Sequence, residues 1–205
     1  MLLANNLFFK RDNNIILKNI NVSISPKKII HLKGSNGVGK TTLLKILSNV
    51  VKPDNGEVFW NAKNIRKDPF ELYKNLTFIM DKKTSNDSLT VYENIVFWCE
   101  LFSSKIKIKE IDAILNLLSL YQYKNTPINQ LSYGEIKKLE LSRLIIEHKK
   151  LWILDEPYIG LDRSSTNLVN QTIINHANIG GMIIFTSHTI PEISTLHTLT
   201  IGDDE

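Results

Sequence analysis

The segment Gly34-Ser35-Asn36-Gly37-Val38-Gly39-Lys40-Thr41 matches the pattern G-x-x-x-x-G-K-[ST] and decides the fold of this 205-residue chain. A phosphate chain carries several negative charges, and glycines let backbone N–H groups turn inward and approach it closely. The pattern predicts that Lys40 reaches the terminal phosphates and that Thr41 binds Mg²⁺. We therefore assign this loop, extended to Thr42, to the phosphates of a nucleotide.

The residues on both sides of the loop support this assignment. Ile29-Ile30-His31-Leu32 is predicted to be a strand that runs directly into the loop. Residues 40–49 are predicted to form a helix, whose N-terminus would point its positive end at the phosphates. The alternative to a phosphate-binding loop is an ordinary glycine turn with a solvent-exposed lysine. Such a turn would need neither the strand before it nor the helix after it.

Strand and helix signals alternate along the chain, which indicates an α/β domain. Further strands are predicted at residues 2–9, 20–25, 57–60, 76–80, 151–154 and 182–185. The turn Arg11–Asn14 is predicted to join the first two as an antiparallel element. We find no internal repeat or linker, and we expect residues 1–205 to form a single domain.

The middle of the chain has helical periodicity and no strand signal. Thr90 and Glu93 have the spacing of a capping box, which predicts the start of a helix. An apolar stripe predicts a second helix, and its members are Ile111, Ile114, Leu115 and Leu118. We expect a helical insertion at about residues 83–145.

A second motif, Leu151-Trp152-Ile153-Leu154-Asp155-Glu156, is an apolar run that ends in two carboxylates. Asp155, at the end of a buried strand, is suited to hold Mg²⁺, directly or through water. Glu156 is placed to polarise an attacking water molecule. A cap for the following segment is the alternative role of these carboxylates. Together the two motifs predict the binding and hydrolysis of Mg-ATP.

Composition excludes several other classes of protein. Apolar residues make up 42% of the chain and charged residues 22%, which is ordinary for a globular domain. The net charge is +4, but the lysines are scattered in pairs and form no basic stripe, so no nucleic acid partner is predicted. No apolar run of 18 residues exists that could span a membrane. The one cysteine, Cys99, lies in an apolar run and is predicted to be a core residue.

Leu131-Ser132-Tyr133-Gly134-Glu135 resembles the signature sequence, LSGGQ, of ATP-binding cassette (ABC) ATPases. It departs from that sequence at Tyr133 and Glu135. The resemblance implies an ABC ATPase core with an N-terminal antiparallel β element and a helical subdomain. It also implies that these five residues bind the γ-phosphate of ATP held by the opposite subunit of a head-to-tail homodimer.

Other positions are carried over from the same resemblance. Gly160-Leu161-Asp162 resembles the D-loop, so Asp162 is expected near the partner subunit. His188 resembles the switch histidine that contacts the γ-phosphate, although in isolation it is typical of an ordinary strand-end histidine. An aromatic residue near the N-terminus stacks on adenine in the family. Phe9 is our candidate, and Phe8 is the alternative.

One position departs from the family in its charge. The family has Gln after the strand predicted at residues 76–80, where it senses Mg²⁺ and couples to the membrane partner. Lys82 stands there in this chain, beside Asp81. A cation next to Mg²⁺ is repelled by it unless the lysine reaches a phosphate instead. A nucleotide-binding module with weak hydrolysis is therefore an alternative function.

The chain also resembles the CcmA type of ABC subunit, which acts in cytochrome c maturation. Stretches such as Asn75–Ile79, Leu89–Asn94 and Pro127–Ser132 carry this resemblance. It implies an ATPase that drives haem export or haem-chaperone release, docked on separate integral membrane subunits at the cytoplasmic face of the inner membrane. The alternatives are the ATPase of another exporter, a soluble ABC protein of DNA repair or translation, and a P-loop kinase.

Overall fold

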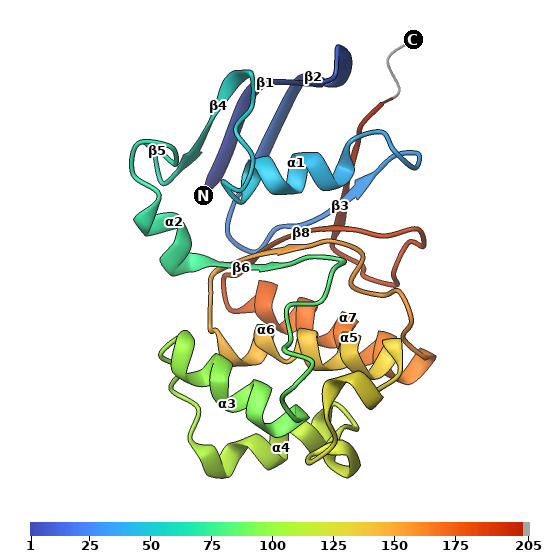
Figure 1. Ribbon diagram of the computed structural model, residues 1–205. Coiled ribbons are helices and arrows are strands. Elements are labelled where there is room, and N and C mark those ends of the chain that lie inside the picture. Colours follow the sequence, from blue (N-terminus) through green and yellow to red (C-terminus); the bar gives the residue numbers. More distant parts are fainter. Residues whose placement is uncertain (203–205) are drawn as a thin grey trace.

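The computed structural model describes residues 1–202 and shows two sheets with a helical layer beneath them (Figure 1). The first sheet is four-stranded, in the order β2-β1-β4-β5. Its paired strands are antiparallel, and their bounds are Leu2–Arg11 for β1, Asn14–Ile24 for β2, Asn55–Trp60 for β4 and Lys63–Asn64 for β5. The predicted N-terminal antiparallel element is confirmed.

The β1–β2 hairpin is longer than predicted. Its turn consists of Asp12 and Asn13, both with positive φ, which matches the twist that a two-residue hairpin needs. The prediction that the second strand starts at residue 20 was wrong, because β2 begins at Asn14. Asn19 has a φ of 53° and the pairing register shifts nearby. This irregularity interrupts the alternation of buried and exposed residues from which a strand is recognised.

The second sheet is five-stranded and parallel, in the order β6-β7-β8-β3-β9. Its strands are β3 (Ile29–Lys33), β6 (Leu76–Ile79), β7 (Leu151–Leu154), β8 (Met182–Thr186) and β9 (Leu196–Thr200). Every residue of β7 and β8 is buried. Continuous apolar runs of this kind are typical of parallel strands covered on both faces, and four of the five strands were predicted from them.

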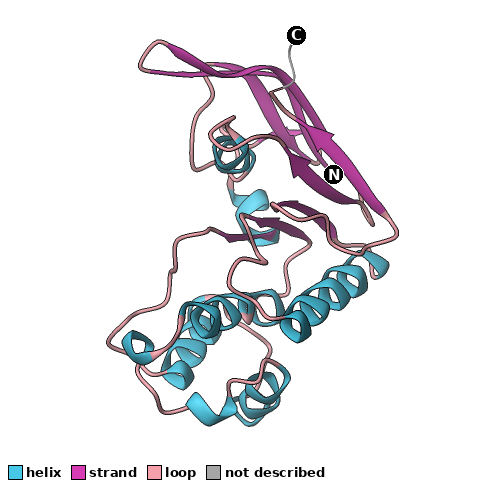
Figure 2. Cartoon of the chain, turned by 90° about the vertical axis from the view of Figure 1, so that its right-hand side faces the viewer, coloured by secondary structure: helices cyan, strands magenta, loops and turns pink. Residues whose placement is uncertain are grey.

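Helix α1 (Lys40–Leu47) fills the space between the two sheets (Figure 2). Its apolar side chains join a core cluster that includes residues of β1, β2, β4, β7 and β8. α1 ends two residues before its predicted end, since Asn49 is left-handed with a φ of 64°. Helix α2 (Phe70–Asn75) precedes β6.

The opposite face of the parallel sheet is covered by α7 (Arg163–Asn178), and a second cluster forms there around Trp152, Phe185 and Ile173. The sequence patterns did not predict α2, α7 or β9. Helix α7 is rich in Asn, Ser and Thr, which have low helix propensity, so its pattern is weak. Tertiary packing and its cap, Asp162, stabilise it instead.

The segment between β6 and β7 is helical and has an apolar cluster of its own. Its helices are α3 (Val91–Leu101), α4 (Ile111–Leu117), α5 (Tyr133–Leu141) and α6 (Arg143–Ile146), with short 3₁₀ turns at Ile108–Glu110, Tyr121–Tyr123 and Ile128–Gln130. The capping box of Thr90 and Glu93 is confirmed at the start of α3. Cys99 is half-buried against this cluster.

A buried ionic network joins these helices to the parallel sheet. Glu140 on α5 accepts hydrogen bonds from the backbone N–H of Thr84 and of Ser85, both at 2.7 Å, and from the Thr84 hydroxyl at 2.6 Å. Arg143 donates from Nε to Glu147 at 2.6 Å. Glu147 in turn accepts from Thr77 on β6 at 2.7 Å. We name this connection the Glu140 clamp.

We expect Glu140→Ala to lower the free energy of unfolding by roughly 3 kcal/mol, because the buried N–H of Ser85 and the partly buried N–H of Thr84 lose their acceptor and Arg143 loses a nearby carboxylate. Urea denaturation measures the effect. Glu100→Ala, at an exposed site on α3, is the control and should change stability by no more than about 0.5 kcal/mol. Equal stability of the two variants would refute the clamp.

Candidate functional site

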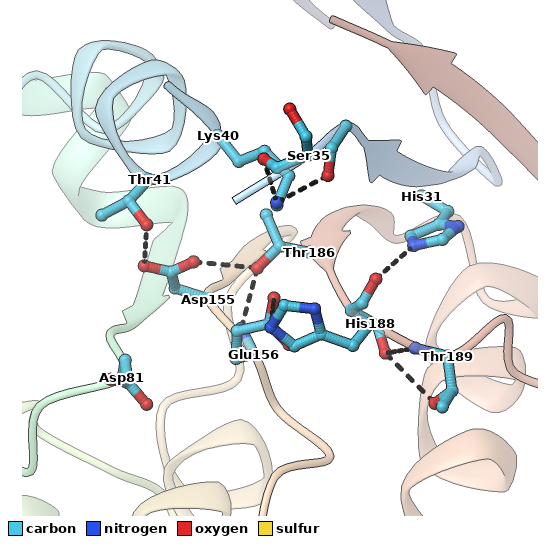
Figure 3. A network of polar contacts seen from close by, with 12 residues as sticks. His31, Ser35, Lys40, Thr41, Asp81, Asp155, Glu156, Thr186, His188 and Thr189 are labelled. Atoms are coloured by element: carbon cyan, nitrogen blue, oxygen red, sulfur yellow. Dashed lines mark hydrogen bonds and ion pairs between the residues drawn. The ribbon is translucent and has the colours of Figure 1, made fainter. Parts of the chain in front are cut away.

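Functional side chains gather where the parallel strands end. Lys40 and Thr41 follow β3, Asp155 and Glu156 follow β7, and Thr186 is the last residue of β8. Because parallel strands all leave the sheet at the same edge, these side chains converge there, as Figure 3 shows. Open α/β sheets bind ligands at this edge.

Asp155 is the centre of the arrangement. Its side chain is buried, and Oδ2 accepts a hydrogen bond from the Thr41 hydroxyl at 2.8 Å. Oδ1 accepts from the Thr186 hydroxyl, also at 2.8 Å. The two residues predicted to bind Mg²⁺ are thus in direct contact. Sequence reasoning missed Thr186, because it is simply the end of an apolar strand and belongs to no motif.

Glu156 is held in a strained backbone conformation. Its φ is 49°, which is uncommon for a residue with a side chain and typical of sites where the surrounding structure imposes it. Its N–H donates to the Thr186 hydroxyl at 2.9 Å. The Glu156 side chain is largely buried, and its Oε1 lies 3.7 Å from Nε2 of His188. The structure therefore brings the two predicted catalytic residues together.

The glycine-rich loop wraps around the Lys40 side chain. Its ammonium donates to the backbone carbonyls of Gly34 at 2.8 Å and Ser35 at 3.0 Å. Gly39 precedes α1 with a φ of 109°, and a Cβ there would lie 2.8 Å from the Ile16 side chain. Glycine is therefore required at position 39 for both conformation and space.

The residues 131–135 form the start of α5. Ser132 is its N-cap and makes a capping box with Glu135, whose carboxylate accepts from both N–H and hydroxyl of Ser132 at 2.7 Å. Desolvation raises the pKa of Glu135, but hydrogen bonds with Tyr123 and Ser132 outweigh it, and the net pKa is lowered. Within residues 1–202, no hydrogen bond joins this segment to the loop Gly34–Thr42.

Tyr133 connects the signature-like segment to two others. Its hydroxyl donates to Asp81 at 3.2 Å, and its ring packs on Gly160, where a Cβ would come within 2.5 Å of Tyr133 Cδ1. Asp162 caps α7, and hydrogen bonding from the Ser165 backbone lowers the pKa of Asp162 to about 2. The D-loop-like segment is therefore beside the signature-like segment in the same chain.

A cavity of about 570 Å³ opens beside the glycine-rich loop, next to Gly37 and Val38. Its apolar walls come from β2 and from the chain after β9, and include Ile15, Ile16 and Ile201. Phe9 is half-buried against the main core and does not line this cavity. The assignment of Phe9 to adenine thus stays a prediction.

The ABC transporter family matches this chain over residues 17–159. The chain belongs to the ABC transporter family. The match includes the glycine-rich loop, the signature-like segment and both carboxylates after β7, so the resemblance inferred from those motifs is confirmed.

Relatives of this ABC protein include proteins named cytochrome c biogenesis ATP-binding export protein CcmA. One from Yersinia pestis is 35% identical over 188 residues, covering 92% of this chain and 86% of that protein. One from Nitrosomonas europaea is 33% identical, and the match covers 98% of this chain and 96% of that protein. One from Vibrio vulnificus is 30% identical, and the match covers 99% of this chain and 100% of that protein.

Solved structures confirm the fold of this ABC protein. A dimeric ATP-binding cassette with bound ADP and phosphate has a TM-score of 0.83 at 22% identity, covering 100% of this chain and 98% of that one. A putative ABC transporter ATP-binding protein from Pyrococcus furiosus has a TM-score of 0.81 at 24% identity, covering 97% and 96%. Among the helices that the structure describes, none is long and apolar enough to cross a membrane.

We expect Thr186→Val to destabilise the protein by roughly 2 kcal/mol, because Asp155 loses a donor and the Glu156 N–H loses its acceptor. Hydrogen exchange of the Glu156 amide should accelerate in this variant. Thr186→Ser is the matched control, since it keeps the hydroxyl and loses only a methyl group. Unchanged protection of that amide in Thr186→Val would contradict the hydrogen-bond assignment.

Proposed function

We propose that this ABC subunit binds Mg-ATP on residues 34–42 and hydrolyses it with Glu156. The observation that carries the proposal is the chain of contacts from Thr41 through Asp155 and Thr186 to Glu156. It joins the end of the phosphate-binding motif to the candidate base through two hydroxyls and one carboxylate.

The donor atoms fit Mg²⁺. Hard divalent cations prefer carboxylate and hydroxyl oxygens, and Thr41 Oγ1 and Asp155 Oδ2 supply one of each. When bound, the ion would neutralise charge on the phosphates. Within residues 1–202, no cluster of three or more His, Cys, Asp or Glu could hold a metal alone, in accord with an ion held partly by the nucleotide.

The chain's own residues have distinct roles in this proposal. The loop N–H groups and the N-terminus of α1 hold the phosphates, and Lys40 exchanges its carbonyl partners for them. Glu156 orients a water molecule and accepts its proton. We propose that His188, whose Nε2 lies 3.7 Å from Oε1 of Glu156, contacts the terminal phosphate from the same side.

The signature-like segment, residues 131–135, is the proposed contact with a second copy of the chain. We propose that residues 131–135 and Asp162 face the nucleotide of a second copy, so that two chains enclose two ATP molecules. The curated relatives are named cytochrome c biogenesis ATP-binding export proteins. We propose the same role here, with haem export or haem-chaperone release driven through separate membrane subunits. The chain would act at the cytoplasmic face of the inner membrane.

A binding module with weak hydrolysis is the second candidate. Lys82 lies in the segment that follows β6, where the family has Gln, and Glu135 occupies the hydroxyl of Ser132. Both observations favour a slow enzyme. Hydrolysis by the wild-type protein distinguishes the two candidates, because no turnover with ATP still bound would favour the binding module.

We expect Lys40→Ala to weaken ATP binding on the order of 100-fold, because the charged hydrogen bonds to the phosphates are lost. Isothermal titration calorimetry with Mg-ATP measures this. Lys45→Ala, in the last turn of α1, removes a lysine from the other end of the helix and should leave affinity unchanged. Near-wild-type affinity of Lys40→Ala would remove the phosphate-binding role.

We expect Glu156→Gln to keep ATP affinity and to slow hydrolysis at least about 100-fold, because the base is lost while shape and backbone stay. Phosphate release, measured with and without the membrane subunits, reports turnover. Gel filtration with ATP should show a dimer in this variant. Equal turnover in Glu156→Gln and Glu100→Gln would exclude Glu156 as the base.

A further inference from the structure

Lys137, in the middle of α5, is a buried cation without a partner. Its side chain is only 3% exposed, and its Nζ has no hydrogen-bond partner among the residues the structure describes. A buried ammonium is expensive unless opposite charges compensate it. The environment of Lys137 must therefore supply negative charge.

Carboxylates lie near Lys137 on the side of the candidate site. Asp81 lines the same cavity as Lys137 and follows closely after β6, whose last residue, Ile79, accepts a hydrogen bond from the Asp155 N–H at 2.8 Å. Lys137 lines a cavity of about 610 Å³ whose walls include Asp81, Lys82 and Tyr133. Desolvation lowers the pKa of Lys137, and the carboxylates of Asp81, Asp155, Glu140 and Glu156 oppose that change. Figure 3 shows Asp81 below Asp155 and Glu156, on the far side from the glycine-rich loop.

These carboxylates are already engaged with other groups. Asp155 accepts from Thr41 and Thr186, and Glu140 accepts from Thr84 and Ser85. No ion pair within 4.0 Å joins Lys137 to any of them in residues 1–202. The ammonium thus acts through its field rather than through a fixed contact, and the burial of Lys137 and Asp155 reduces the screening of that field by water.

We propose that Lys137 is a positioning residue that serves as the internal counter-ion of Asp81, Asp155 and Glu156 and opposes the binding of a divalent cation between Thr41 and Asp155. The proposal rests on the proposed function. A cation at that position draws on the same carboxylates, so two positive charges compete for one set of negative ones. Coupling of this kind is reciprocal.

The reciprocity gives α5 a role in regulation. Cation binding disfavours the position of Lys137, and any movement that withdraws α5 raises affinity for the cation. The same helix begins at Ser132, in the segment proposed to meet the second copy. Contact of a second copy with the N-terminus of α5 would therefore change the affinity for the cation through the side chain of Lys137.

The test is the affinity for a non-hydrolysable ATP analogue, measured by calorimetry once in excess EDTA and once in saturating Mg²⁺. The ratio of the two dissociation constants reports how strongly Mg²⁺ supports binding. We expect Lys137→Met and Lys137→Gln each to increase this ratio by about fivefold or more. Lys137→Arg, which keeps the charge, should stay within about twofold of wild type.

Lys109→Met, at an exposed site in the helical region, controls for the general loss of a positive charge. An unchanged ratio in a folded Lys137→Gln would overturn the proposal, and so would an equal loss of affinity in both buffers, which marks a structural role alone. Wild-type protein that binds the analogue in neither buffer would instead overturn the proposed function, and the counter-ion role with it.

Discussion

Parallel pairing of β7 between β6 and β8, with β3 beyond β8, is the constraint on which the site depends. Each strand enters from one edge and leaves at the other, so the residues that follow it meet the residues that follow its neighbours. Asp155 stands at the centre of that edge and is reached by hydroxyls from two sides. A shift of one residue in the register of β7 would point Asp155 away from Thr41 and leave the buried carboxylate without donors.

Local chemistry made part of this site predictable from sequence. Glycines at fixed spacing before Lys40 are specific to a phosphate-binding turn, and the apolar run before Asp155 identifies a buried strand. Such patterns do not predict the order of the strands in the sheet. The contact between Thr41 and Asp155 could therefore be expected only because both residues were assigned to the same Mg²⁺. Thr186 had no signal of its own, because a hydroxyl at the end of an apolar strand is common. The adenine contact was the least predictable part, since it was carried over from the family resemblance alone and Phe9 packs half-buried against the core.

Other differences arose where tertiary structure overrides local preference. Helix α7 contains few strong helix formers, yet packing against the parallel sheet and the cap at Asp162 hold it. The irregular pairing around Asn19 interrupts the alternation of buried and exposed residues, so the first half of β2 was not predicted. The capping box of Ser132 and Glu135 had the same S/T-x-x-E pattern as that of Thr90 and Glu93 and could have been recognised. Glu135 thus has a local structural role as the capping-box residue of α5, a role that Gln can also fill.

The Glu140 clamp has a mechanical consequence. Strand β6 ends at Ile79 and the clamp begins at Thr84, so only residues 80–83 connect the two anchored ends. Fully extended, the five Cα–Cα steps from Ile79 to Thr84 span about 18 Å at most, which sets the largest separation of the two anchored ends. The helical region therefore cannot move farther from the sheet than this tether allows without breaking the hydrogen bonds of Glu140 to Thr84 and Ser85.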